Sequence, residues 1–178
     1  MSTRLIHRTA AAPTREIAEC LEGLILSELL DPGKRFIIVS PWMGDFPVVD
    51  NRSGAFANIE PSWNASYIRL STVLRGLLSR GSVVRIGCGE GTPERELIGR
   101  IEQAADADGT RAALSVSRLP RQHPLMNHEK AIVTDTWAMH GSMNFTYAGV
   151  SMNGELITVT TDPNAAATVA TELLGLFP

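Results

Sequence analysis

Residues 128–144 read His-Glu-Lys-Ala-Ile-Val-Thr-Asp-Thr-Trp-Ala-Met-His-Gly-Ser-Met-Asn, and this stretch constrains the fold of the chain most tightly. It contains two short apolar runs, 131–133 and 137–139, with a tight turn after Asp135 between them. Apolar runs separated by a short turn predict two neighbouring strands joined as a hairpin. A hairpin returns the end of the stretch to its beginning, so polar residues at its two ends are expected to meet.

The polar side chains of this hairpin are predicted to share one small area. His128 and Lys130 are two residues apart in a predicted strand, so the alternation of side chains places them on one face. The hairpin brings Ser142 and Asn144 back beside them, and Glu155 leads into another strand. The expected site therefore combines imidazole, ammonium, hydroxyl, amide and carboxylate groups.

This set of groups suits attack on a phosphodiester bond. Imidazole serves as a nucleophile or as an acid and base near neutral pH. An ammonium and an amide stabilise charge that builds on the non-bridging oxygens, and a carboxylate fixes the imidazole tautomer. The chain has only two lysines, Lys34 and Lys130, and the second lies in this stretch. The chemistry requires no metal ion, and we expect no cofactor.

Outward from this stretch, helix and strand signals alternate. Strands are predicted at four further places: 35–40, 83–87, 112–117 and 156–160. Helices are predicted at 15–30 after a Thr14 cap, at 67–80, from Thr92-Pro93 to 107, and from Asp162-Pro163 to 176. A long loop is expected from about 41 to 62. Helices between buried strands predict an α/β layered sandwich, formed as a single domain over residues 1–178.

Charge and composition exclude several classes of protein. The 178 residues carry a net charge of −3, which argues against a strongly basic packager of nucleic acid, although a nuclease that grips a few phosphates fits. No run approaches 18 apolar residues, and the first 16 residues lack an apolar signal region. We therefore expect no membrane insertion and a cytoplasmic location. The two cysteines, Cys20 and Cys88, are expected to be reduced thiols.

The motif residues have the order His-x-Lys-x4-Asp, Gly-Ser-x-Asn and Asn-x-Glu between His128 and Glu155. This order resembles the HKD motif of the phospholipase D superfamily, with five residues rather than the usual six between Asp135 and Gly141. Residues 35–43, RFIIVSPWM, are similar to the opening strand of such domains, and residues 79–91 are similar to their second helix–strand unit. The resemblance implies a phospholipase D-like fold, with a mixed β-sheet flanked by helices.

The resemblance also implies roles for the motif residues. His128 is expected to be the nucleophile that forms a phosphohistidine, or the acid that protonates the leaving oxygen. Lys130 and Asn144 are expected to bind the phosphate, with Ser142 in support, and Glu155 to orient His128. Because the family mechanism uses two histidines and this chain has one motif, we expect a homodimer with one shared site.

Residues around the motif have more than one interpretation. Asp135 and Gly141 are expected to be structural and to shape the hairpin. Trp42 in the long loop is a candidate to stack on substrate, although a packed loop is the alternative. Arg121 and His123 lie in a cluster that precedes the motif and are candidate substrate-binding residues, although a solvated surface explains them equally well.

Taken with the resemblance, the motif predicts a metal-independent phosphodiesterase, most readily a nuclease that cleaves DNA. A phospholipase D-type lipid hydrolase and a non-catalytic DNA-binding or dimerisation module are the alternatives. Residues 40–51, SPWMGDFPVVDN, and the single-motif layout are similar to the phospholipase D-like component of bacterial systems that insert 7-deazaguanine bases into DNA. That similarity implies a DNA-modification or defence setting with protein partners.

Overall fold

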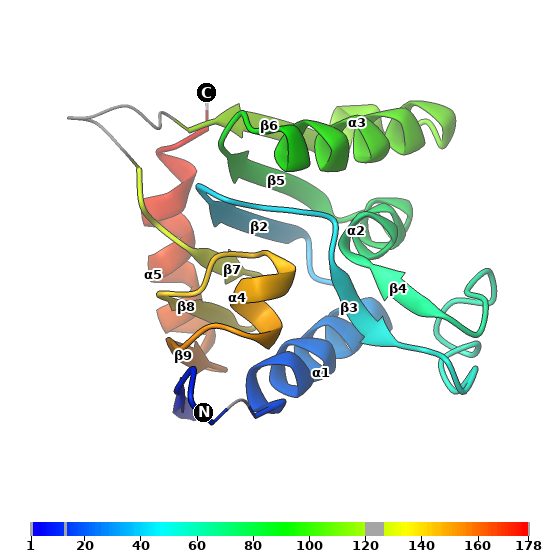
Figure 1. Cartoon of the computed structure of the whole chain (residues 1–178). Helices are drawn as coiled ribbons and strands as arrows, with labels where there is room; N and C mark the ends of the chain where they lie inside the picture. The colour runs from blue at the N-terminus through cyan, green and yellow to red at the C-terminus, as the bar shows by residue number, and fades with distance from the viewer. Residues whose placement is uncertain (1, 13, 120–126, 178) are drawn as a thin grey trace.

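The computed structural model describes residues 2–12, 14–119 and 127–177, and within them a seven-stranded mixed sheet forms the centre of the molecule (Figure 1). Its spatial order is β1-β9-β8-β7-β2-β5-β6. The strands are β1 (Thr3–Arg8), β2 (Arg35–Ser40), β5 (Val83–Cys88), β6 (Leu114–Arg118), β7 (Ala131–Val133), β8 (Ala138–Gly141) and β9 (Glu155–Thr160). The expected mixed sheet flanked by helices is confirmed.

Strand directions in the sheet follow from the connections between strands. β2, β5 and β6 are parallel, because helices cross over between them. The strands from β7 onward are antiparallel to their neighbours, and β7 and β8 form the predicted hairpin. Since β7 runs antiparallel to β2, the start of β7 lies at the carboxyl end of β2. The end of β8 and the start of β9 lie at this same end of the sheet.

Helices cover both faces of the sheet (Figure 1). α1 (Glu16–Leu30), α2 (Leu70–Ser79) and α3 (Thr92–Ala107) pack on one face, and α5 (Pro163–Leu174) packs on the other. The short α4 (Tyr147–Ser151) lies beside α1, and a single 3-10 turn, η1 (Arg111–Ala113), precedes β6. Within the described ranges, none of these helices is long and apolar enough to cross a membrane.

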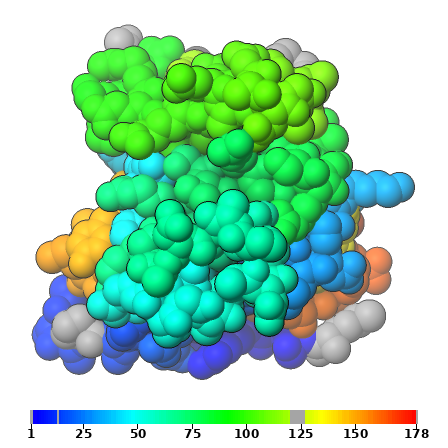
Figure 2. Space-filling view, turned by 90° about the vertical axis from the view of Figure 1, so that its right-hand side faces the viewer, coloured from blue at the N-terminus to red at the C-terminus, as the bar shows by residue number. Residues whose placement is uncertain are grey.

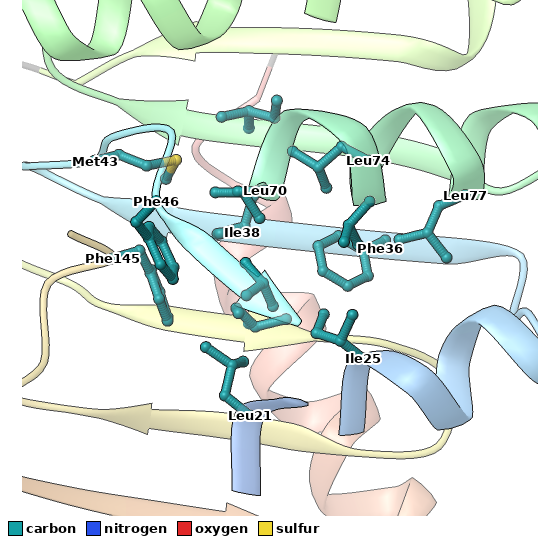
Figure 3. Close-up of a cluster of buried hydrophobic side chains, with 14 of the residues drawn as sticks. Leu21, Ile25, Phe36, Ile38, Met43, Phe46, Leu70, Leu74, Leu77 and Phe145 are labelled. Carbon is teal, nitrogen blue, oxygen red and sulfur yellow. The ribbon is translucent and has the colours of Figure 1, made fainter. Parts of the chain in front are cut away.

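The core is built around β2, whose two faces are both buried. Phe36 and Ile38 point into the larger cluster with α1 and α2, as Figure 3 shows. Ile37 and Val39 point to the opposite face, where they meet the alanines of α5. An interior strand covered on both faces needs apolar residues at every position, which explains the unbroken run in this segment.

Several elements differ from the sequence prediction. The predicted helix at 67–80 begins with a strand, β4 (Tyr67–Arg69), which pairs with β3 (Pro47–Asp50) from within the predicted loop. β1 was not predicted, because its apolar residues lack a regular period. Arg15 rather than Thr14 precedes α1. Asp162 caps α5 as predicted, by accepting a hydrogen bond from the Asn164 N–H.

Candidate active site

The motif residues gather at the sheet end where β2 finishes and β7 begins. His128 and Lys130 come directly before β7, and the β7–β8 turn is tight because the Thr134 N–H donates to the Trp137 carbonyl at 2.9 Å. β8 then returns Ser142 to this end, beside Glu155 at the start of β9. The topology thus accounts for the meeting of groups that the hairpin pattern predicted.

Lys130 and His128 are in direct contact. The Lys130 ammonium lies 2.9 Å from His128 Nδ1 and donates to the His128 carbonyl at 2.6 Å. An ammonium has donors only, so Nδ1 accepts this hydrogen bond and the neutral ring carries its proton on Nε2. The His128 side chain itself is exposed. In this arrangement Nε2–H is the group that can donate a hydrogen bond to a substrate.

The Lys130 side chain is 5% exposed, which is unusual for lysine. Burial lowers the pKa of its ammonium group, while the nearby Glu155 carboxylate acts in the opposite direction. A partly desolvated cation interacts more strongly with an anion than a solvated one does, because the local dielectric constant is lower. Lys130 therefore presents a partly desolvated cation at this end of the sheet.

Glu155 contacts Ser142 rather than His128. The Ser142 hydroxyl donates to Glu155 Oε2 and accepts from the Leu156 N–H at 3.0 Å. The Glu155 side chain is buried, and its charge acts on Lys130. Among the described residues, no hydrogen bond joins Glu155 to His128. The orienting role of Glu155 toward His128 therefore stays a prediction.

Asn144 is held from two sides. The Ser40 hydroxyl shares its one hydrogen between two acceptors, Asn144 Oδ1 at 3.2 Å and the Trp42 carbonyl at 2.7 Å. On the other side, α4 approaches so closely that a Cβ on Gly149 would lie 2.1 Å from the Asn144 carbonyl oxygen. With its oxygen held by Ser40, the amide can present Nδ2–H to a substrate oxygen.

Trp42 lies at the site, as its predicted role requires. Its ring centroid is 6.0 Å from that of His128, with an interplanar angle of 82°. Trp42 is 40% exposed, whereas Phe46 of the same loop is buried. The packed-loop interpretation therefore applies to Phe46, and Trp42 presents an aromatic surface next to the imidazole.

The surroundings of Asp135 and Gly141 fit the structural roles predicted for these two residues. Asp135 accepts hydrogen bonds from the Arg35 side chain at 2.6 Å and from the Lys34 N–H at 2.6 Å. Partial burial raises the pKa of Asp135, but these hydrogen bonds outweigh it, so its pKa lies below the usual value. At Gly141, φ is +154°, and a Cβ would lie 2.3 Å from the Leu156 carbonyl oxygen, so a side chain does not fit.

Two predicted substrate-binding residues, Arg121 and His123, lie outside the described residues. In the ranges that are described, no group of three or more His, Cys, Asp or Glu side chains is arranged to hold a metal ion. The site that can be built from the chain thus consists of His128, Lys130, Ser142, Asn144 and Glu155, with Trp42 at its edge.

Three supporting residues were missed by sequence reasoning. Ser40 is the last residue of β2. A polar residue directly after four apolar residues was the sequence feature that could have marked it. Gly149 interrupts a short helix, which indicates a close approach. Arg8 is 1% exposed and donates to the carbonyls of Gly149 and Val150 at 2.5 Å each and of Asn153 at 2.8 Å. Nothing local marks Arg8, because its partners lie more than 140 residues away.

Comparison with known proteins agrees with the geometry of the site. Residues 66–176 match the family described as "Cardiolipin synthase, PLD-like domain". No curated protein sequence matches the chain.

The fold is similar to several solved structures. Nuc from Salmonella typhimurium, a phospholipase D family member, is 14% identical with a TM-score of 0.58, over 98% of this chain and 93% of Nuc. Phosphatidylserine synthase from Haemophilus influenzae Rd KW20 is 15% identical with a TM-score of 0.64, over 99% of this chain and 39% of the synthase. TrmBL2, an archaeal chromatin protein, is 12% identical with a TM-score of 0.52, over 97% of this chain and 50% of TrmBL2.

The matched region includes every residue of the hairpin, of α4 and of β9, so the family match covers the whole motif. The chain therefore belongs to the PLD-like domain family of the phospholipase D superfamily, whose chemistry is at phosphodiester bonds.

Proposed function

We propose that this protein is a metal-independent phosphodiesterase that cleaves DNA through a phosphohistidine intermediate. The observation that carries the proposal is the contact between the buried Lys130 ammonium and the exposed His128 imidazole, with Asn144 fixed at the same sheet end. This arrangement supplies a nucleophile or acid together with two donors for the non-bridging oxygens.

The tautomer of His128 suggests how the site responds to substrate. As long as Lys130 donates to Nδ1, the proton of the neutral ring is on Nε2, so Nε2 has no lone pair for attack. A phosphate group that takes the Lys130 ammonium as its own donor releases Nδ1. The ring proton can then reside on Nδ1, which leaves Nε2 with a free lone pair for attack on phosphorus.

Two copies of His128 divide the reaction between them. One forms a bond from its Nε2 to phosphorus, and the P–O bond to the leaving oxygen breaks. The second, protonated as an imidazolium, donates its Nε2 proton to that oxygen and becomes neutral. Water then attacks the phosphohistidine, and the second His128 accepts a proton from that water. The P–N bond breaks, which releases the DNA end that carries the phosphate. A homodimer with a shared site supplies both histidines.

DNA is the proposed substrate class for two reasons. Trp42 gives the site an exposed aromatic ring on which a base can stack. TrmBL2, which has a similar fold, is described as binding DNA in a novel mode. We further propose a DNA-modification or defence setting with protein partners, on the similarity of residues 40–51.

The direct test is cleavage of labelled single-stranded DNA and supercoiled plasmid in EDTA, by the parent protein and by His128→Ala. We expect cleavage by the parent and a loss of more than about 10³-fold in the variant, because both histidine roles disappear together. His140→Ala is the matched control, since His140 is exposed and pairs with Ala131 on the face covered by α5. The cleavage rate should also fall steeply with salt concentration.

Other outcomes of the same test point to the alternatives. Cleavage that survives in His128→Ala would contradict the proposed chemistry. If the parent leaves both DNAs intact, hydrolysis of phosphatidylcholine vesicles would identify a lipid hydrolase instead. A gel shift with His128→Ala, in the absence of any turnover by the parent, would identify a DNA-binding module. Co-purification of the chain with other proteins from its native cells tests the proposed setting.

A further inference from the structure

We propose that a groove on the far side of α4 from Asn144 binds an unpaired nucleobase that carries an exocyclic amino group. The groove has a volume of about 320 Å³ and is formed by the N-terminal half of α1, by β3, by Tyr67 of β4 and by α4. In Figure 1, α4 and β3 lie in front of the sheet with the first turns of α1 beside them, and both elements contact α1. The volume is at the lower end of the range for small-molecule sites.

The walls of the groove are aromatic, and its base is apolar. Tyr67 is 49% exposed and Tyr147 is 57% exposed, although burial of an aromatic ring usually stabilises a protein. Val48 and Val49 of β3 are buried beneath them. Two exposed rings over an apolar base provide the surface on which a flat aromatic ligand stacks.

The ring of Tyr67 is held in place before any ligand arrives. The Arg52 guanidinium lies 4.5 Å from its centroid and is itself fixed by Asp50 at 2.8 and 2.7 Å. A ring fixed in this way loses little conformational entropy when a ligand stacks on it. Such preorganisation is typical of a binding surface rather than of a side chain without a role.

Charge in the groove favours a base over a phosphate. Glu22 and Asp50 both line it, and among the described residues Arg15 is the only basic group in the lining. Asp50 is already paired with Arg52, whereas Glu22 uses Oε1 to accept from the Asp50 N–H at 2.9 Å. Carboxylate oxygens accept hydrogen bonds from exocyclic amino groups, as in contacts with cytosine N4. Glu22 therefore favours adenine, cytosine or guanine over thymine.

The groove adjoins the proposed site, and this inference rests on the proposed function for its biological role. Tyr147 follows Asn144 by three residues, a span of at most about 10 Å. Gly149, two residues further along α4, packs against the Asn144 backbone. A single strand whose phosphate lies at Asn144 can thus place a neighbouring base in the groove. Figure 2 shows α4, in orange, close to the cyan segment that contains β3.

The test measures binding of short single-stranded oligo(dC) and oligo(dT) by fluorescence anisotropy. Every protein compared carries His128→Ala, because the parent is proposed to cleave single-stranded DNA even in EDTA. Tyr147→Ala should weaken oligo(dC) binding about 10-fold, and Tyr147→Phe should leave it unchanged because it keeps the ring. Glu22→Gln should reduce the preference for oligo(dC) over oligo(dT). Met152→Ala is the matched control, because Met152 is equally exposed at the end of α4 but does not line the groove.

The outcomes separate this inference from the proposed function. Equal binding of oligo(dC) with and without Tyr147→Ala overturns the groove site, even if the parent cleaves DNA. Equal affinity of His128→Ala for the two oligonucleotides overturns the assignment of the amino-bearing base. Hydrolysis of bis(p-nitrophenyl) phosphate, a diester without a nucleobase, tests the phosphodiesterase chemistry apart from the groove. If the parent fails to hydrolyse both this diester and DNA, the proposed function fails, whereas Tyr147-dependent binding would still stand.

Discussion

At the residue scale, the most unusual group in the site is the buried ammonium of Lys130. It contacts the imidazole and the backbone carbonyl of the same residue, His128, and its closest opposite charge is the buried Glu155. Burying a charge without a hydrogen-bonded counter-ion costs free energy. The buried ammonium therefore lowers the stability of the fold, and the proposed function gives it the role of a phosphate ligand.

Replacement of this lysine should separate stability from activity. Because burial lowers the pKa of Lys130, the folded protein binds this proton less tightly than the unfolded chain does. The resulting penalty to folding is complete below the lowered pKa and disappears as the pH rises above 10.5. We expect Lys130→Met to raise the free energy of unfolding at pH 7 and to lower activity about 10²- to 10³-fold.

Urea denaturation at pH 7 and at pH 10 measures this effect, and the gain in stability should shrink at the higher pH. Lys34→Met is the control, because Lys34 is the other lysine of the chain and lies outside the site. A variant that is less stable than the parent at pH 7 would contradict the penalty assigned to Lys130.

Glycine is required at position 141 for a steric reason. Gly141 has φ of +154°, and an added Cβ would collide with the backbone of β9. We expect Gly141→Ala to destabilise the protein by about 1–3 kcal/mol and to displace Ser142. Gly99→Ala is the matched control: it lies exposed within α3 with nothing near its Cβ position, so this change should stabilise by about 0.5–1 kcal/mol. Thermal unfolding of both variants measures these changes in stability. Equal changes in the two variants would refute the steric argument.

At the element scale, α4 positions part of the site although it has only one turn and a half. Such a short helix is not stable alone, so its position depends on tertiary contacts. Thr146 caps its start by accepting from the Gly149 N–H at 3.1 Å. The Arg8 guanidinium from β1 binds the carbonyls at its other end. The first strand of the chain thereby fixes a helix that packs against Asn144.

The dependence of α4 on Arg8 can be measured. Arg8→Met removes three charge-assisted hydrogen bonds and leaves buried carbonyls without these donors, which should cost at least about 2 kcal/mol. Hydrogen exchange of the 147–153 amides should rise more than that of the central strands. Arg4→Met on the same strand is the control, because its ion pair with Glu16 is exposed and should contribute less than about 1 kcal/mol. Similar losses in the two variants would contradict the role given to Arg8.

At the scale of the whole molecule, the mixed sheet brings all of the motif residues to one end. The parallel strands β2 and β5 finish there, and the antiparallel strands β7 and β9 begin there. One chain nevertheless supplies only one His128. The proposed dimer would place two such sheet ends against each other, so that each contributes one histidine to a single site.

Mixing experiments test this shared site. If subunits exchange freely, a mixture of equal amounts of parent and His128→Ala forms parent homodimers in only about a quarter of the pairs. Activity per parent chain should therefore fall to about half. Activity that depends only on the amount of parent chain would show independent sites. Light scattering that gives a monomer at assay concentration would contradict the dimer as well.

The sequence by itself determined the hairpin, the identities of the groups in the site and the layered α/β class. These features depend on residues close together in the chain, because the alternation of a strand and the geometry of a tight turn act over a few positions. The spacing of His128, Lys130, Ser142 and Asn144 therefore predicted their meeting. The strand β2 was predicted with its observed bounds, since an interior strand requires a continuous apolar run.

Only the tertiary structure decided which groups are partners. It paired Glu155 with Ser142, joined Lys130 to Nδ1 of His128, and placed Arg8 beneath α4. It also added β1 to the sheet through pairing with β9, across more than 140 residues of chain. Such contacts depend on how whole layers pack, and their free energy is gained only when distant segments are already in place. For that reason, the local sequence specified the chemistry of the site but not its hydrogen bonds.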